Sequence, residues 1–399
     1  MDEQIYFNPW DEAFRANPYP YYRPLYGRPP YPLNLFIPMA LVANYDHAVE
    51  ILQDHQRFSS KQQTTSAFEE QDRTLFAGSA TMLFSDPPTH TRLRKLVSRA
   101  FTPKRIRDLE PRIREISATL LDRAATRGEI EVVADLATPL PVMVIAEMLG
   151  IPPGDYERFK HWSDRVVESD NVPPGMPLPE EIKQAARDLR AYFSAAIEAR
   201  RRAPGDDLIS ALVAAHDEND ALDAGELLAF VLLLLLAGNE TTTNLIGNGM
   251  LALGRNPDQL ELLRGRPELA PRAVEEMLRY DGPVQSTVRH NREVVEIGGA
   301  RIEPETMIFV ILAAANRDPA HFRDPDRFDI TREPDGHLAF GDGIHFCLGA
   351  ALARLEAAIA FGAAVARFPR LRLAQPDATA HYKGSYFLRG LSALRMAIK

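Results

Sequence analysis

The chain has 399 residues, of which 45% are apolar and 25% charged, and its 46 basic and 55 acidic residues give a formal net charge of −9. A disordered or collagen-like chain would be less apolar or would repeat glycine at a fixed period, and a nucleic-acid-binding protein is usually basic. We therefore expect a soluble globular protein that binds no nucleic acid. The single cysteine, Cys347, excludes an intramolecular disulfide, a Cys-x-x-Cys redox pair and an all-cysteine zinc site.

The amino-terminal segment gives two expectations. Residues 1–10 contain no basic stretch followed by an apolar core, so we expect neither a signal peptide nor a membrane anchor, and a cytoplasmic location. The first 40 residues hold eight prolines, and proline lacks the N–H group that a helix interior needs. This segment is therefore expected to be extended and rich in turns.

The middle of the chain reads mainly as helix. From Asp86 to about residue 290 the sequence predicts helices interrupted by Gly- and Pro-containing turns. Strand signals are fewer, at 39–44, 287–298, 306–314 and near the carboxyl end. We expect a mainly α fold with a small β region. Length alone, at roughly 150 residues per domain, would suggest two or three domains.

One predicted helix is unusually long. Asp223 and Glu226 form a plausible capping box, and Gly254 before Asn-Pro is a plausible end, so the helix has roughly 30 residues and a length of about 45 Å. Its apolar run, 227–238, is shorter than the roughly 20 residues that span a membrane. We therefore expect a buried core helix.

The centre of this helix breaks the local rules. Residues 237–243, Ala-Gly-Asn-Glu-Thr-Thr-Thr, are poor helix formers, and threonine hydroxyls can bond to carbonyls one turn earlier and bend a helix. One interpretation is a tolerated polar insertion. The functional interpretation is that Glu240 and Thr241 deliver protons beside small residues that leave room for a ligand.

The cysteine follows a glycine-rich loop and precedes a helix. Residues 340–349 read Phe-Gly-Asp-Gly-Ile-His-Phe-Cys-Leu-Gly, and residues 350–359 are strong helix formers. Free N–H groups and the positive end of the helix dipole favour a thiolate at Cys347, as an anionic ligand or a nucleophile. His345 is a nearby base, but no orienting group is evident for nucleophilic catalysis. A structural core cysteine is the alternative.

The loop resembles the haem signature of the cytochrome P450 family, Phe-x-x-Gly-x-x-x-Cys-x-Gly, in its soluble bacterial form. The resemblance runs from the Pro-Tyr-Pro segment near Tyr19 to Leu391, and implies the family's fold, with haem between the long central helix and the helix after the cysteine. One haem domain over 1–399 then replaces the expectation of two or three. Further matching segments are Asp86-Pro-Pro-Thr-His90-Thr-Arg-Leu-Arg94, Ala237-Gly-Asn-Glu-Thr-Thr242, Glu276-Met-Leu-Arg279 and Pro325-Asp-Arg327-Phe328.

The resemblance implies roles for individual residues. Cys347 would be the axial thiolate ligand of haem b, whose electron donation favours O–O cleavage. Glu240 and Thr241 would be the acid–alcohol pair of the oxygen-binding groove. Donors to the haem propionates would be His90, Arg94, Arg289 and His345. Other residues at the haem would be Ala237, Gly238, Phe340, Gly341 and Gly349.

A buried ion-pair cluster is also implied. Glu-x-x-Arg occurs at several places in the chain, and position selects Glu276 and Arg279. Arg327 would add a second arginine to the cluster. Buried charges need such partners, so we expect a structural role in supporting the haem loop and no catalytic role.

The implied activity is that of a haem-thiolate monooxygenase that hydroxylates or epoxidises a hydrophobic small molecule such as a fatty acid, terpenoid, steroid or polyketide. The chain has no dinucleotide fingerprint and no length for a fused flavin domain, so a separate ferredoxin or flavodoxin with its reductase would supply electrons, and NAD(P)H would act only indirectly. Arg354 is a candidate contact for that partner, an ordinary solvated arginine being the alternative. We expect a monomer.

The substrate cavity is expected to be apolar. The family pattern implies lining residues at Leu233, Leu236, Ala237, Val284, Gln285 and Phe387, with an entrance formed by 61–83 and 173–179. Two other functions stay open, a peroxide-driven peroxygenase and a non-catalytic haem sensor. A peroxygenase would typically place an arginine near Glu240 and Thr241, and a sensor would need no proton-delivery pair. The identity of the substrate is left open.

Overall fold

The computed structural model describes residues 5–34, 38–61, 76, 78–172, 176–217, 220–333, 336–376, 379–383 and 387–399. The chain groups into two compact units, which are described separately. The first unit comprises 1–60, 111–140 and 241–399, and the second comprises 61–110 and 141–240.

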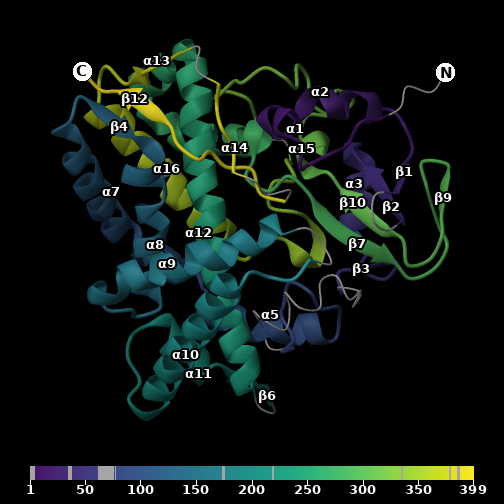
Figure 1. The fold of residues 1–399 in the computed structure, drawn as a ribbon, viewed down its shortest axis with the longest axis horizontal. Helices are drawn as coiled ribbons and strands as arrows, with labels where there is room; N and C mark the ends of the chain where they lie inside the picture. Colours follow the sequence, from purple (N-terminus) through teal and green to yellow (C-terminus); the bar gives the residue numbers. More distant parts are fainter. Residues whose placement is uncertain are drawn as a thin grey trace. The chain divides into compact units, whose positions relative to one another are not determined.

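The first unit contains a five-stranded sheet in the order β1-β2-β10-β7-β3 (Figure 1). Strand β2 pairs in parallel with β10, and the other neighbours are antiparallel. Because β2 and β10 lie far apart in sequence, their pairing joins the amino-terminal segment of this unit to its later part. The strand bounds are β1 Tyr31–Asn34, β2 Pro38–Val42, β3 Phe58–Ser59, β7 Thr287–Asn291 and β10 Met307–Val310.

One face of this sheet packs on α3, Tyr45–Gln53. Its buried residues Ile51 and Leu52 belong to the same apolar cluster as Val42, Ile308 and Val310 of the sheet. All four residues of β10 are buried, which suits a central strand covered on both faces. The predicted strands at 39–44 and 287–298 are thus found in part, as β2 and β7 with β8.

The amino-terminal segment is more helical than the sequence predicts. Helix α1, Glu12–Ala16, begins where the Asp11 side chain accepts the Ala13 N–H at 2.7 Å. Helix α2, Tyr19–Tyr22, has a proline in its first turn, where a missing N–H costs nothing. The prolines therefore start short helices here instead of preventing them.

The helical part of the first unit is built around α16, Ala350–Arg367, which packs against α13, Pro257–Gly265, and α14, Ala270–Asp281. Residues 312–314, predicted as part of a strand, lie in the short helix α15, Leu312–Ala315, where the N–H groups of Ala314 and Ala315 both bond to the Ile311 carbonyl. The remaining elements are α7 Glu110–Ala125, the hairpin β8 Val295–Ile297 with β9 Ala300–Ile302, and the sheet of β4 Glu129–Glu131, β12 Arg395–Ala397 and β11 Arg372–Leu373.

The second unit is mainly helical. Helix α10, Glu180–Arg202, packs against α9, Tyr156–Val167, and α11, Leu208–Ala214, and α11 packs against α5, Thr89–Ala100. The buried residues of α10 recur at helical spacing, from Ile182 through Leu189 and Phe193 to Ile197, so one apolar stripe explains the packing. Further elements are α6 Pro103–Asp108, α8 Pro139–Met148 and the hairpin β5 His216–Asp217 with β6 Asp220–Ala221.

The long predicted helix is α12, Ala224–Arg255, and it contributes residues to both units. The capping box is present, since the Asp223 N–H donates to Glu226 Oε2 at 3.1 Å and the Glu226 N–H to Asp223 Oδ1 at 2.8 Å. The helix is continuous through residues 237–243. Among the described residues it is the one helix long and apolar enough to span a membrane, a test that the core helix of a soluble protein also passes.

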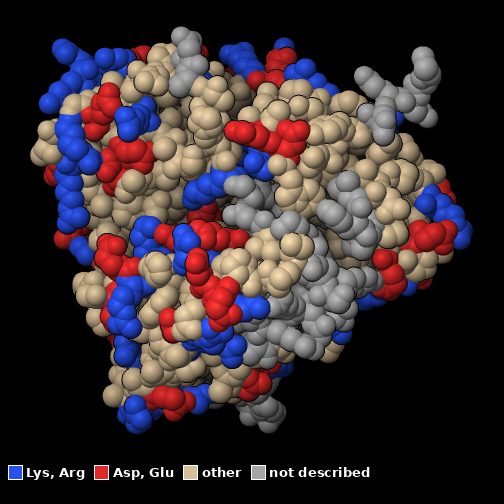
Figure 2. All heavy atoms as spheres, viewed as in Figure 1, with Lys and Arg blue, Asp and Glu red and all other residues tan. Residues whose placement is uncertain are grey.

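On the face in Figure 2, basic and acidic side chains are interspersed in the left and lower parts of the view. Several oppositely charged pairs of the chain are neighbours on one helix, such as Lys160 with Asp164 on α9 and Arg201 with Glu198 on α10. Exposed pairs of this kind stabilise a fold by well under 1 kcal/mol each.

Candidate functional site

The cysteine loop connects Ala339 to the start of α16. The Cys347 N–H donates to the Phe340 carbonyl at 3.0 Å, and the Ala353 N–H donates to the Gly349 carbonyl at 3.0 Å in the first turn of the helix. The loop therefore closes on itself just before α16 begins. This confirms the predicted geometry, with Cys347 near the amino end of a helix, where partial positive charge favours a thiolate.

Two glycines give the loop its shape. Gly341 and Gly343 have φ values of +69° and +67°, which residues with a side chain rarely adopt. A Cβ on Gly343 would lie 2.4 Å from the Leu52 carbonyl oxygen of α3, so the loop backbone packs directly on that helix. The Asp342 carboxylate adds a contact, accepting a 3.0 Å hydrogen bond from Gln53.

The loop also has an uncovered side. Residues 340–349 are all partly or largely exposed, although Ala339 and Ala350 on either side of them are buried. A Cβ built on Gly341 would meet no atom within 4 Å. The thiol is a soft sulfur donor that suits iron, and space lies beside its loop. The residues of this loop therefore fit a haem.

The middle of α12 has an open face as well. Ala237 is exposed, although Leu235 and Asn239 on either side of it are buried, and a Cβ on Gly238 would meet no atom within 4 Å. Of the residues expected to contact substrate here, Leu233 is buried and Leu236 is half-buried. Small residues at the centre of a core helix thus leave room against its backbone, as the sequence interpretation required.

Two polar residues in the middle of α12, Asn239 and Thr243, bond to neighbouring segments. The Thr243 hydroxyl donates to the Ala137 carbonyl at 3.0 Å, and the Asn239 amide donates to the Ser163 hydroxyl at 3.3 Å. Because these two side chains donate to other segments, they do not compete with the backbone N–H groups of α12 for its carbonyls. The helix therefore continues without a break. Glu240 and Thr241 are both half-buried neighbours on this stretch.

The predicted propionate donors lie on three elements. His90 and Arg94 are four residues apart on α5, so their side chains share one face of the helix, His90 buried and Arg94 half-buried. Arg289 lies on β7 and is also buried, with a 2.8 Å hydrogen bond to the Val288 carbonyl. His345, in the cysteine loop, is half-buried.

Three of the residues expected at the substrate come together in the first unit. The Gln285 N–H donates to the Phe387 carbonyl at 2.8 Å, and Val284 forms an isolated β-bridge with Leu388. The Phe387 ring stacks on Phe309, with centroids 5.9 Å apart. Two segments about a hundred residues apart in sequence are thereby joined.

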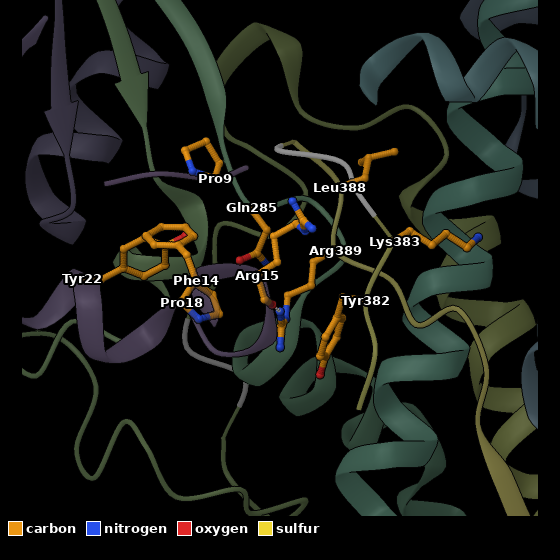
Figure 3. Close-up of a pocket in the computed structure, with 10 residues that line it drawn as sticks. All are labelled: Pro9, Phe14, Arg15, Pro18, Tyr22, Gln285, Tyr382, Lys383, Leu388 and Arg389. Atoms are coloured by element: carbon orange, nitrogen blue, oxygen red, sulfur yellow. Dashed lines mark hydrogen bonds between the residues drawn. The ribbon is translucent and has the colours of Figure 1, made fainter. Parts of the chain in front are cut away.

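Figure 3 shows a pocket in the first unit, lined by Gln285 and by residues from the amino- and carboxyl-terminal segments. The Arg389 guanidinium lies 3.5 Å from the centroid of the Tyr382 ring and donates to Asp281 at 2.7 Å. Gln285 Oε1 is buried and has no hydrogen-bond partner among the described residues. Cys347 is not one of the lining residues in the described part of the chain, so this pocket is separate from the cysteine loop.

The ion-pair cluster corrects one expectation. Arg279 Nε and Nη2 donate to the two Glu276 carboxylate oxygens at 2.7 and 2.9 Å, and both residues are buried. The second arginine at Glu276 is Arg332, with Nε 3.3 Å from Oε2, and not Arg327. The Arg327 side chain is 66% exposed and pairs with Asp329 at 3.6 Å, while its backbone carbonyl accepts from Arg279.

The physical reason for the correction is the turn before Arg327. Asp324 has a φ of +47°, and the Arg332 guanidinium folds back to donate to the carbonyls of Arg323 and Asp324 at 2.7 and 3.0 Å. Sequence reasoning missed Arg332 because loop conformation, which no residue period predicts, decides which side chain reaches Glu276. The expected entrance residues 62–75, 77 and 173–175 lie outside the described residues.

A helical fold with a small sheet region and a cysteine loop before a helix are the features of a haem-thiolate enzyme. A family model described as cytochrome P450 matches residues 26–265 and 267–380, and the chain belongs to this family. The predicted family and fold class are confirmed, as is the enzyme class, a cytochrome P450 monooxygenase. Enzymes of this family use haem and dioxygen, receive electrons from redox partners and bind hydrophobic substrates.

Individual relatives extend this result. The chain is 49% identical to cytochrome P450 107B1 of Saccharopolyspora erythraea, over 78% of this chain and 76% of the relative. It is 42% identical to 6-deoxyerythronolide B hydroxylase of the same organism, over 89% of each chain. The crystal structure of the myxobacterial cytochrome P450 CYP267B1 in complex with myristic acid superposes with a TM-score of 0.89 at 40% identity, covering 98% of both chains.

Proposed function

We propose that this chain, over its whole length of 1–399, forms one haem domain that binds haem b with Cys347 as the axial thiolate ligand. The observation that carries the proposal is the partly exposed Cys347 in a glycine-shaped loop before α16. The bound haem would supply dioxygen reduction and the insertion of one oxygen atom into the substrate. The chain would place the substrate, exclude water and deliver protons.

The residues that would hold the haem follow the family pattern. Phe340, Gly341 and Gly349 would form the surface of the cysteine loop, and Ala237 with Gly238 would leave room beside α12. Positive charge would compensate the two propionates, and buried guanidinium groups favour such anions. The propionate donors in this proposal are His90, Arg94, Arg289 and His345.

Glu240 and Thr241 would deliver protons. A carboxyl group and a hydroxyl group next to each other can pass a proton from solvent towards a buried oxygen atom while the surrounding apolar residues exclude bulk water. In this proposal the Thr241 hydroxyl gives its proton to the oxygen and Glu240 replaces it. The half-buried position of both residues is compatible with such a relay.

The proposed substrate is a hydrophobic small molecule such as a fatty acid, terpenoid, steroid or polyketide, which the enzyme hydroxylates or epoxidises. Two relatives with different ligands support this breadth, the 6-deoxyerythronolide B hydroxylase and the cytochrome P450 bound to myristic acid. We propose contacts from Leu233, Leu236, Ala237, Val284, Gln285 and Phe387. Electrons would come from NAD(P)H through a reductase and then a ferredoxin or flavodoxin. The enzyme would be a monomer and would lie in the cytoplasm.

The carbon monoxide spectrum of the reduced protein tests thiolate ligation. The red-shifted Soret band of a thiolate-ligated haem is expected in the wild-type protein and is expected to be lost in Cys347→Ala. A band that persists in Cys347→Ala, or that is absent from the haem-loaded wild type, contradicts the proposal. Product formation with a surrogate reductase, compared with hydrogen peroxide alone, separates a monooxygenase from a peroxygenase and from a sensor.

Thr241→Ala tests the proton relay. The variant is expected to keep its haem and its reduced carbon monoxide spectrum while diverting electrons to peroxide or water. The measurement is the ratio of product formed to NAD(P)H consumed, with the neighbouring Thr243→Ala as control because the Thr243 hydroxyl donates to Ala137. An unchanged ratio in Thr241→Ala contradicts the assigned role.

A further inference from the structure

Arg354 lies on α16, seven residues after Cys347, and forms a two-point contact with α14. Its Nε donates to Glu275 Oε1 at 2.7 Å and its Nη2 donates to Glu275 Oε2 at 2.8 Å. The planar guanidinium and the planar carboxylate therefore meet fork to fork, the geometry in which an ion pair is both strong and directional. This contact fixes the Arg354 guanidinium to a helix instead of leaving it in solvent.

The same guanidinium covers Phe340, the first residue of the cysteine loop. Its central carbon lies 4.5 Å from the centroid of the Phe340 ring, within the range of a cation–π contact. The Phe340 carbonyl accepts the hydrogen bond of the Cys347 N–H at 3.0 Å. One short chain of contacts thus runs from Glu275 through Arg354 and Phe340 to the backbone of Cys347.

His337 holds the other side of this arrangement. Its Nδ1 accepts the Ala339 N–H at 3.2 Å, so the ring proton lies on Nε2, which is 3.1 Å from Glu275 Oε2 and donates to it. Its ring centroid is 6.2 Å from that of Phe340. Glu275 therefore binds α16 and the segment before the loop at the same time.

The environment of Glu275 shows that these contacts outweigh its burial. Burial raises the pKa of its carboxyl, but hydrogen bonds from His337 and Arg354 together with the charge of Arg354 lower the pKa to about 2. The carboxylate is 18% exposed and the Arg354 side chain 35% exposed. The contact uses two of the five N–H donors of Arg354.

We propose that Glu275, Arg354 and His337 are positioning residues that hold Phe340 and thereby set the conformation of the Cys347 loop. This role rests on the proposed function to the extent that Cys347 is the haem ligand. It is an alternative to the expected contact of Arg354 with a redox partner, which the experiment below tests. The network holds the loop from α14 and α16.

The test compares four variants of the full-length, haem-loaded protein. Arg354→Gln and Glu275→Gln remove the charge-assisted pair, and Arg354→Lys keeps the charge but not the planar fork. Arg367→Gln is the matched control, because Arg367 also lies on α16, pairs with Asp122 at 2.8 Å and has its guanidinium carbon 5.8 Å from the Phe368 ring centroid. Two measurements are made on each variant.

The first measurement is amide hydrogen exchange of residues 338–347, which reports on the loop itself. Loss of a hydrogen bond to a charged group is expected to raise exchange at Cys347 by about tenfold or more in Arg354→Gln and Glu275→Gln. Arg354→Lys is expected to have a smaller effect and Arg367→Gln none. Equal acceleration in residues 357–365 of α16 would indicate global destabilisation and overturn the positioning role.

The second measurement is the fraction of reduced carbon monoxide complex with the red-shifted Soret band. This fraction is expected to fall in Arg354→Gln and Glu275→Gln and to be retained in Arg367→Gln. Unchanged exchange and spectrum together with a raised KM for a reduced ferredoxin would establish docking and overturn the proposal. A wild-type protein without the band would refute thiolate ligation, while the exchange measurement would still test the network.

Discussion

Two carboxyl groups on neighbouring helices of the first unit are equally buried and differ in their partners. Glu276 on α14 and Glu356 on α16 are each 3% exposed. Glu276 receives hydrogen bonds from Arg279, Arg332 and the Asp329 N–H. Glu356 Oε2 has no partner in the described part of the chain, and burial raises the pKa of Glu356 to about 8.

The difference shows that burial alone does not decide the charge of a core carboxyl. Two guanidinium groups compensate the charge of Glu276. No ion pair compensates a charge on Glu356 in the described part of the chain, so the neutral acid of Glu356 is favoured at pH 7. Glu276 thereby ties loop 324–332 to α14, while Glu356 makes the stability of α16 sensitive to pH.

The largest expected effect comes from Glu356→Gln at alkaline pH. Because the folded state raises the pKa from 4.5 to about 8, the wild-type free energy of unfolding falls relative to the variant as pH rises from about 4.5 to 8. At about 1.4 kcal/mol per pH unit the full difference is on the order of 5 kcal/mol. Denaturant midpoints of both proteins at pH 5 and pH 9 measure it.

A constant difference between the two proteins across this pH range would show that Glu356 is charged at neutral pH, or that it finds a partner. Either result would remove the contrast with Glu276. Glu198→Gln, an exposed residue of α10, is the control for pH effects on the rest of the chain.

The second effect comes from breaking the compensated pair. Arg279→Met leaves the Glu276 carboxylate buried with Arg332 as its remaining guanidinium partner, and is expected to cost about 3 to 5 kcal/mol. Arg327→Met is the control, because that side chain is mostly exposed, and is expected to change stability by less than about 0.5 kcal/mol. Equal costs for the two variants in denaturant unfolding would restore Arg327 to the cluster.

Glu275→Gln gives an intermediate effect with the opposite pH dependence to Glu356→Gln. The folded state lowers the pKa of Glu275 to about 2, so its stabilisation is present above the ordinary value of 4.5 and is lost as pH falls towards 2. We expect the variant to be less stable by about 2 kcal/mol at pH 7. The difference should shrink steadily in unfolding experiments at pH 5, 4 and 3.

The smallest effect is expected for the exposed ion pair between Asp122 of α7 and Arg367 of α16. Asp122 and Arg367 are 65% and 49% exposed, so Asp122→Asn should cost no more than about 0.5 kcal/mol. Added salt should change the wild-type and variant midpoints equally. A cost above 1 kcal/mol would mean that exposure is a poor guide to the strength of the ion pairs on α16.

The sequence predicts elements well where one residue pattern determines the local structure. The Asp223 and Glu226 capping box is formed as expected, and α16 begins after the glycine-rich loop. Elements decided by tertiary contacts are predicted less well. The sequence of residues 312–314 is compatible with either a strand or a helix. The helix is stabilised in the structure because the Ile311 carbonyl accepts two N–H groups.

Single side chains show the same division. Glu356 had a signal in the sequence, since it lies four residues after the buried Leu352 and three before the buried Ile359, on one face of α16. The contact of Arg332 with Glu276, in the place expected for Arg327, had no signal in the sequence, because it depends on the turn at Asp324. The pairing of Arg354 with Glu275 likewise depends on how α14 and α16 pack.

Gly343 and Gly238 have different consequences for directed evolution. A saturation library at Gly343 should yield almost no folded members, because any side chain would collide with the Leu52 carbonyl oxygen. A Cβ on Gly238 would meet no atom within 4 Å, so Gly238→Ala is expected to fold, but the proposed function gives that space to the haem, and the variant is expected to bind less haem. The packing of the chain itself therefore requires glycine at 343, whereas only the proposed ligand would require it at 238.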